Sequence, residues 1–459
     1  MFKKIQQYLL LHYPLLWNIK IAPVFAVLAV LHIALFAIGY FSTQFENLTT
    51  YGRYNEVFTY PLVFMFCLII ILLVLILWLI HYSQNNAFRV FYPQSSASLY
   101  GEWLMVLLIV FALFALPFTH IKGVEAKIRT FVADKEEVAR NVEIINQIEC
   151  LIPDYKNKFL SSAVRNDYFP DSILKKNPNE QAFASLLNQY FESGPIYNNL
   201  PATGNQQTVE LWLLTEDEPQ IRSLIRNFLL LVEKHHLRTS LTVDKWMELI
   251  YNPPTYPITD DNLIAAYKND NNPNYVPFEK LNYAYKDIYR TYYDTGTADA
   301  LLLILCLAGI ASLLIFSCRY TDRKSWLIAL IAALVLSIVY SAFSALVDML
   351  SDTDLFMLPF WFGVFVFELI YVIRLICRSL SKRYSSVMIN HLFWMLPFVP
   401  IMLVAFYLYV DGNYYTTTLR KWIDDNFMEI IWISVVFAFV TVGLFIHYIV
   451  RPWKSLPEQ

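Results

Sequence analysis

Residues 61–80 read PLVFMFCLIIILLVLILWLI, a run of apolar side chains without a single charge. A helix needs about 20 apolar residues to cross the hydrocarbon core of a bilayer, and this run is long enough. The whole chain has the same character, since 57% of its 459 residues are hydrophobic, 16% are charged and the mean hydropathy is +0.42. Soluble domains carry about 25% charged residues, so the composition indicates a protein embedded in lipid.

Seven further segments approach the length and apolarity of residues 61–80. Together the eight expected spans are residues 19–41, 61–81, 102–119, 299–318, 326–349, 355–377, 389–410 and 429–450. The sequence therefore predicts a polytopic α-helical membrane protein with eight transmembrane helices. Pro359 in the sixth span and Pro397 and Pro400 in the seventh predict kinks in those spans.

Lysine and arginine in the short flanks of the spans predict the orientation, because cytoplasmic flanks are enriched in both. With the N-terminus inside, the short outer loops hold only Arg53, Arg420 and Lys421. The inner flanks hold Lys3, Lys4, Lys20, Arg89, Arg319, Arg323, Lys324, Arg374, Arg378, Lys382, Arg383, Arg451 and Lys454. Both termini are therefore expected in the cytoplasm, and the short positive flanks fit a bacterial inner membrane.

The long segment between the third and fourth spans is expected outside the cytoplasm, as a folded domain of mixed α/β type. Helices are expected at residues 123–150, 219–237 and 281–293, a loop at 252–277, and a strand at 208–215 (TVELWLLT). The expected organisation is an amphipathic interfacial helix (1–18), spans one to three (19–119), an extracytoplasmic domain (120–298), spans four to eight (299–450) and a cytoplasmic tail (451–459).

Motifs for enzymatic chemistry are absent from the sequence. It contains no Walker phosphate loop, no G-x-G-x-x-G, no G-x-S-x-G and no H-E-x-x-H. Its five cysteines and eight histidines show no metal-ligand spacing, and its net charge of −3 does not favour nucleic acid. We therefore expect no catalytic residue, metal or cofactor, and any ATP used must be bound by a separate subunit.

The loop before the third span carries a family resemblance. Residues 82–101 read YSQNNAFRVFYPQSSASLYG and are followed by Glu102 and Trp103; an amphipathic N-terminal segment carries Phe2, Ile5 and Leu9 on one face. This start resembles the permeases of ABC-2-type transporters over about the first 120 residues, although such permeases commonly have six spans. The resemblance implies a cytoplasmic ATPase subunit as partner and a homodimer or a sister permease. It also implies an ATPase-docking loop that includes Phe88, Arg89, Val90, Phe91 and Glu102.

Polar residues inside the spans are the other candidate site. Glu368 lies near the middle of the sixth span, where an unpaired carboxylate costs a few kcal/mol, and His32 lies in the middle of the first. On the fifth span Ser337, Ser341, Ser344 and Asp348 share one helical face. These groups either line a pathway or join neighbouring helices, as serine does in many membrane proteins.

Three functions remain open at this point. The first is the permease subunit of an ABC-type transporter or exporter. The second is a membrane scaffold or a secretion or sensing component whose outer domain binds a periplasmic protein. The third is an ion-coupled secondary transporter that uses Glu368.

Overall fold

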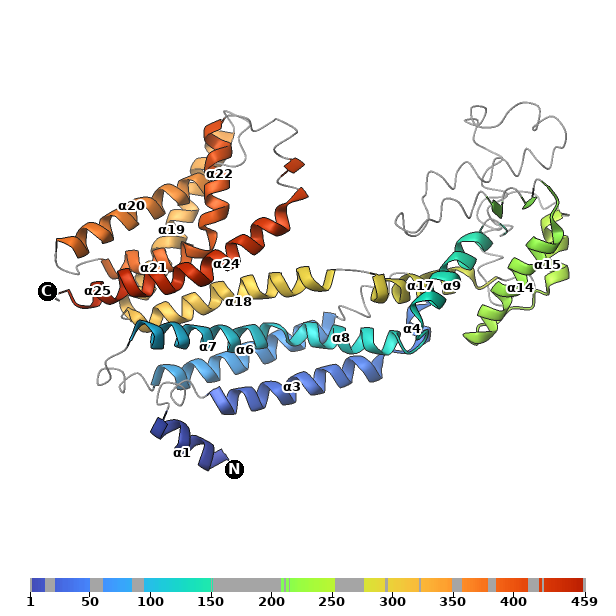
Figure 1. Cartoon of the computed structure of the whole chain (residues 1–459), viewed down its shortest axis with the longest axis horizontal. Coiled ribbons are helices and arrows are strands. Elements are labelled where there is room, and N and C mark those ends of the chain that lie inside the picture. Colours follow the sequence, from blue (N-terminus) through green and yellow to red (C-terminus); the bar gives the residue numbers. More distant parts are fainter. Residues whose placement is uncertain are drawn as a thin grey trace. The chain divides into compact units, whose positions relative to one another are not determined.

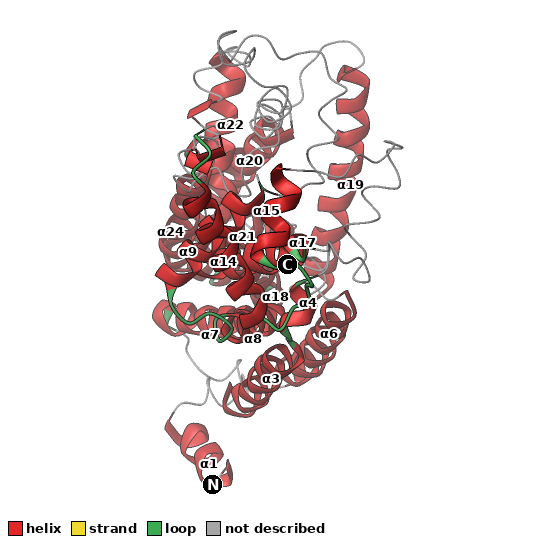
Figure 2. Cartoon of the chain, turned by 90° about the vertical axis from the view of Figure 1, so that its right-hand side faces the viewer, coloured by secondary structure: helices red, strands yellow, loops and turns green. Residues whose placement is uncertain are grey.

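The structure is a computed structural model of the chain. It describes residues 2–12, 21–49, 61–84, 95–149, 151, 208–209, 212–213, 215–251, 276–293, 296–321, 323–348, 357–378, 385–411, 421–422 and 425–456. Within these ranges all regular structure is helical and no strand occurs (Figures 1 and 2).

The chain divides into two compact units, each of which is described by itself. The span unit comprises Met1–Ala34, Val63–Thr119 and Thr295–Gln459. The insert unit comprises Leu35–Leu62 and His120–Asp294.

Eight helices of the described chain are long and apolar enough to cross a membrane, in agreement with the eight apolar helices that the sequence predicts. They cover Ile21–Ser42, Pro61–Tyr82, Ser96–Phe114, Thr297–Cys318, Arg323–Ala342, Phe360–Cys377, Ser385–Val404 and Phe427–Lys454. Many of their apolar side chains are exposed, as expected for surfaces that face lipid.

The helices of the spans and the N-terminal helix are α1 (Phe2–His12), α3 (Ile21–Ser42), α6 (Pro61–Gln84), α7 (Ser96–Phe114), α18 (Gly296–Tyr320), α19 (Arg323–Asp348), α20 (Met357–Cys377), α21 (Ser385–Met395), η2 (Leu396–Phe398), α22 (Val399–Asp411), α24 (Phe427–Phe445), η3 (Ile446–Val450) and α25 (Arg451–Lys454).

The third span begins earlier than the predicted residue 102. The Ser95 hydroxyl accepts a hydrogen bond from the Ser98 amide at 3.1 Å, and this N-cap sets the beginning of α7.

The helices of the insert unit are α4 (Phe45–Leu48), α8 (Leu116–Ile128, shared with the third span), α9 (Lys135–Glu149), α14 (Glu218–Lys234), α15 (Val243–Tyr251) and α17 (Phe278–Tyr293). They enclose one apolar core, in which Ile128, Phe228 and Ile288 are fully buried. The predicted helices at 219–237 and 281–293 are confirmed, apart from their ends. Residues 252–275 lie outside the described residues, so the loop expected there stays a prediction.

Two predictions for this segment are wrong in the described residues. The single helix expected over 123–150 is two helices, because α8 ends at Ile128 and α9 begins at Lys135. The strand expected over 208–215 is not formed at 208–209 or 212–213, which are helical. Val209, Trp212 and Leu213 have the spacing of one helical face and pack on the helical core, so burial decided between two structures that a short apolar run allows equally.

Two glycines of the insert unit let α3 and α8 touch through their backbones. A Cβ atom on Gly39 would lie 2.3 Å from the carbonyl oxygen of His120, and one on Gly123 would lie 2.2 Å from that of Phe36. No side chain fits at such distances, so the close crossing of the two helices requires glycine in both places.

We predict that Gly39→Ala and Gly123→Ala each lower the stability of the protein by about 1–3 kcal/mol, because the added methyl group meets backbone that cannot move aside alone. Gly363→Ala on α20 is the control, since a Cβ atom there has no neighbour within 4 Å. The midpoint of thermal unfolding in detergent measures the effect. Equal midpoints for the three variants would show that the crossing is looser than described.

Candidate functional site

The seventh span is broken in its middle. Pro397 lies in a 3-10 turn, Leu396–Phe398, which separates α21 from α22 and confirms the predicted irregularity. The eighth span also departs from a regular α-helix, since residues Ile446–Val450 form a π turn. Interrupted helices in membrane proteins usually lie beside a cavity or a functional site.

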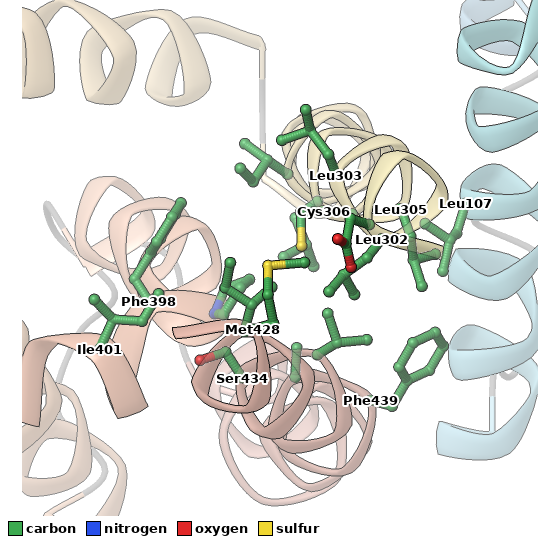
Figure 3. A pocket seen from close by; sticks show the side chains of 18 of the residues that line it. Leu107, Leu302, Leu303, Leu305, Cys306, Phe398, Ile401, Met428, Ser434 and Phe439 are labelled. Atoms are coloured by element: carbon green, nitrogen blue, oxygen red, sulfur yellow. The ribbon is translucent and has the colours of Figure 1, made fainter. Parts of the chain in front are cut away.

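An apolar cavity of about 510 Å³ lies beside the break in the seventh span (Figure 3). Four elements of the span unit form its walls: α7, α18, the η2–α22 segment and α24. Figure 3 shows Cys306 of α18 and Met428 of α24 pointing into the same space, with Phe398 and Phe439 farther out on either side. The volume lies within the range of ligand pockets, which is about 300–1,000 Å³.

The polar groups in the cavity wall are few, and the hydroxyl of Ser434 and the indole of Trp103 are hydrogen-bonded within the protein. The Ser434 hydroxyl donates to the Ile430 carbonyl at 2.9 Å, and the Trp103 indole donates to the Ser312 hydroxyl at 3.1 Å. Among the described residues that line the cavity, Asp299 alone carries a charge. A ligand with buried polar groups would find no partner over most of this wall, so the wall selects hydrocarbon.

The base of the loop between the second and third spans is fastened to the wall of the cavity. The Tyr82 hydroxyl at the end of α6 donates to the buried Glu102 carboxylate on α7 at 3.1 Å. Trp103, the next residue, lines the cavity. The first turns of α7 are therefore tied to α6 on one side and form the cavity wall on the other.

The same end of α7 is also tied to the eighth span. The Tyr100 hydroxyl donates to the Phe439 carbonyl at 3.0 Å, and the Trp103 and Phe439 rings lie 5.5 Å apart. Farther along, the Ser96 hydroxyl and the His447 ring are 3.1 Å apart. Because Phe439 also lines the cavity, the start of α7 is bonded to a second of its four walls.

The sequence singled out Phe88, Arg89, Val90 and Phe91 as the docking part of this loop, and all four lie outside the described residues. The fifth member, Glu102, is 2% exposed. It belongs to the fixed base of the loop and does not form part of an open surface.

Glu368 forms a buried pair with His391. One carboxylate oxygen lies 2.8 Å from His391 Nδ1, and His391 Nε2 lies 2.8 Å from the Ala329 carbonyl oxygen. Glu368 is 6% exposed and His391 3%. The other carboxylate oxygen, Oε2, has no hydrogen-bond partner within the described parts of the chain. The pair links α19, α20 and α21. Nothing in the sequence indicated that His391, near the beginning of its span, would face Glu368.

The other predicted polar residues do not gather around Glu368 in the described structure. The Ser337 hydroxyl donates to Ala333 on its own helix at 2.8 Å, and Ser341 is exposed. Ser344 and Asp348 lie on α19, but their side chains are outside the description. His32 joins two helices through Thr119 at 2.6 Å and the Ala112 carbonyl at 3.0 Å, as a helix-joining histidine would.

The insert unit holds a buried polar cluster that the sequence did not indicate. The Asn141 amide donates to the Tyr285 hydroxyl at 2.9 Å, and the His235 ring nitrogen Nε2 lies 2.8 Å from the same hydroxyl. Burial, with repulsion from Lys234, lowers the pKa of His235 from 6.5 to about 4. Burial raises the pKa of Asp287 on α17 from 3.8 to about 7. No group of three metal-ligating side chains occurs in the described residues of either unit.

These two shifts predict opposite pH dependences for the stability of the insert unit. Between pH 4 and 6.5 the unfolded His235 binds more protons than the folded one, so its contribution to stability grows as the pH rises. Between pH 3.8 and 7 the folded Asp287 binds more protons than the unfolded one, so its contribution falls as the pH rises, by roughly 2–4 kcal/mol in total.

In Asp287→Asn only the His235 effect remains, so the stability of the insert unit should rise from pH 4 to 6.5. In His235→Gln only the Asp287 effect remains, so the stability should fall from pH 4 to 7. In the wild type the two effects oppose each other, so its stability should change less than that of either variant between pH 4 and 6.5. Hydrogen exchange of the α17 amides in the full chain, corrected for the intrinsic rate at each pH, measures this. Glu233→Gln, an exposed acid of α14, is the control. Parallel profiles for the two variants would contradict the assignment.

No protein-family model, no curated protein and no solved structure matches the chain. Its function is therefore inferred from the geometry of its own residues.

Proposed function

We propose that the chain is the membrane (permease) subunit of an ABC-type transporter or exporter in a bacterial inner membrane, working with a separate cytoplasmic ATPase. One observation carries the proposal: the two ends of the loop between the second and third spans are bonded to helices that wall the apolar cavity. Tyr82, before the loop, bonds to Glu102 on α7, and Tyr100, after the loop, bonds to the Phe439 carbonyl on α24. The orientation is the one expected from lysine and arginine, with this loop in the cytoplasm and the insert unit outside.

The mechanism follows from this connection. An ATPase that docks on residues 83–100 pushes on the loop when it binds or hydrolyses ATP. Because the Tyr82 hydroxyl on α6 bonds to Glu102, a displacement of α6 acts on the start of α7. The same movement displaces Trp103 and Phe439, and the cavity changes shape. The broken seventh span forms the opposite wall and provides the place where the bundle bends.

A second permease is part of this proposal, either as another copy of the chain or as a sister subunit. Only 11% of the first and fifth spans, and 17% of the second, is buried inside the chain. Such exposed spans leave wide apolar surface for lipid or for a second permease.

Affinity purification of the tagged full chain in mild detergent tests the proposal. An ATPase should co-purify in stoichiometric amount, and Phe88→Asp or Phe91→Asp in the loop should release it, because a carboxylate weakens an apolar docking contact. Leu230→Asp, an exposed apolar residue of α14 in the insert unit, is the matched control and should retain the ATPase. Tyr82→Phe should retain the ATPase but weaken the response of its activity to substrate.

A preparation without ATPase would overturn the proposal. If an extracytoplasmic protein bound to residues 120–298 appears in its place, the chain is a scaffold or a secretion or sensing component.

The buried Glu368–His391 pair favours a second function, ion-coupled transport. The Ala329 carbonyl can only accept, so His391 Nε2 carries a proton and donates. One further proton then lies between His391 Nδ1 and Glu368, as a neutral pair or as an ion pair. A site that holds one such proton inside the spans has the chemistry needed for proton coupling.

For this second function, infrared difference spectra of the full chain across a pH jump should contain a carboxyl band that is lost in Glu368→Gln and shifted in His391→Asn. Glu429→Gln, an exposed acid at the beginning of α24, is the control. Transport in vesicles that depends on a proton gradient, and not on an ATPase, would favour this function. A spectrum without a band assignable to Glu368 would rule it out.

A further inference from the structure

We infer that the apolar cavity binds one hydrocarbon chain of a lipid whose head group carries an amine, and that the chain enters from the outer leaflet. This inference rests on the proposed function in one respect, since it names the class of substrate that the permease would take. The binding itself needs neither ATP nor a partner subunit.

The chemistry of the wall determines that the occupant is hydrocarbon. The cavity is lined by leucine, isoleucine, phenylalanine and methionine side chains from four elements. The hydroxyl of Ser434 and the indole of Trp103 already donate within the protein. A space of about 510 Å³ is far larger than the share of one water molecule, about 30 Å³, and an apolar wall does not hold water well.

The length of the cavity suits a single chain. From Asp299 to Leu313, α18 rises about 21 Å, and from Phe427 to Phe439, α24 rises about 18 Å, at 1.5 Å per residue. One leaflet contributes about 15 Å, half of the 30 Å hydrocarbon core. The cavity therefore accepts the chain of one leaflet over its full length, with room at its inner end beside Trp103.

The direction of entry follows from the residues at the ends of the cavity. Asp299 and Phe427 belong to the first turns of α18 and α24, which lie at the outer surface in the expected orientation. Trp103 and Phe439 line the other end and are linked to the base of the cytoplasmic loop. A chain therefore enters between the beginnings of α18 and α24.

The charge at this entrance selects the head group. Asp299 is exposed and is the one charged side chain among the described residues of the wall. Asp299 lies in the first turn of α18, where the helix dipole favours a negative charge. A carboxylate at the entrance attracts an amine and repels a head group with a net negative charge.

Photolabelling of the purified full chain tests the inference. The protein is placed in phosphatidylcholine nanodiscs with a small fraction of phosphatidylethanolamine that carries a diazirine in the middle of one acyl chain. Phosphatidylglycerol with the same chain is the second probe. The ethanolamine lipid should label α18 and α24 at the cavity residues, and more strongly than the glycerol lipid.

Gly309 provides a variant that fills the cavity without disturbing the fold. It lines the cavity, and a Cβ atom there would have no neighbour within 4 Å. Gly309→Leu should lower labelling at least about fivefold, because the new side chain occupies space needed by the lipid chain. Gly363→Leu is the matched control, since that glycine is equally open but lies on α20, outside the cavity. Equal labelling of the two variants would place the lipid on the outer surface of the spans and overturn the inference.

Asp299→Asn tests the head group separately. It should reduce the preference for the ethanolamine over the glycerol probe about threefold to tenfold, as expected for one solvent-screened charge pair. Glu233→Gln is the control, because Glu233 is an exposed acid on α14 of the insert unit and does not line the cavity. Equal labelling of the wild type by both probes would overturn the head-group assignment. Cavity labelling in a protein that purifies without ATPase would contradict the proposed function and leave the lipid site standing.

Discussion

A polar group inside a bilayer has to find its partner within the protein, because lipid offers none. The contacts of the span unit follow this constraint. His32 bonds to α7 and to Thr119, Trp103 bonds to Ser312, and His391 bonds at once to Glu368 and Ala329. Each of these bonds fixes which face a helix turns toward its neighbour, since apolar side chains alone can pack on lipid or on protein with little difference in free energy.

The contacts of α7 show how this constraint connects a loop to a cavity. Glu102 needs a partner and finds it in Tyr82, and the adjacent Trp103 turns to the other side of the same helix and bonds to α18. Tyr100 then reaches a backbone carbonyl of α24. Bonds that satisfy buried polar groups thus also join the beginning of α7 to α6 and to α24, a wall of the cavity, and the proposed permease would use this connection.

In the insert unit the helices are amphipathic, and the constraint changes. An amphipathic face has to be covered, and the helices α9, α14, α15 and α17 cover one another's apolar faces. The sequence predicted α14 and α17 because their apolar residues recur at helical spacing. It failed at 208–215, where a short apolar run fits a strand and a helix equally well, and at 129–134, where no strong breaker marks the end of α8.

The sequence by itself determined the eight long apolar helices, the irregular seventh of them and the position of Glu368 within the sixth, because length, apolarity, proline and charge act locally along the chain. It did not determine that Glu368 would meet His391, that α3 and α8 would touch at Gly39 and Gly123, or that α7, α18, α22 and α24 would leave a cavity open. Those features depend on how each helix is rotated about its axis and on which helix becomes its neighbour. In a chain whose spans are apolar on nearly every face, hydrophobic periodicity carries little of that information, and the packing of buried polar and small residues decides it.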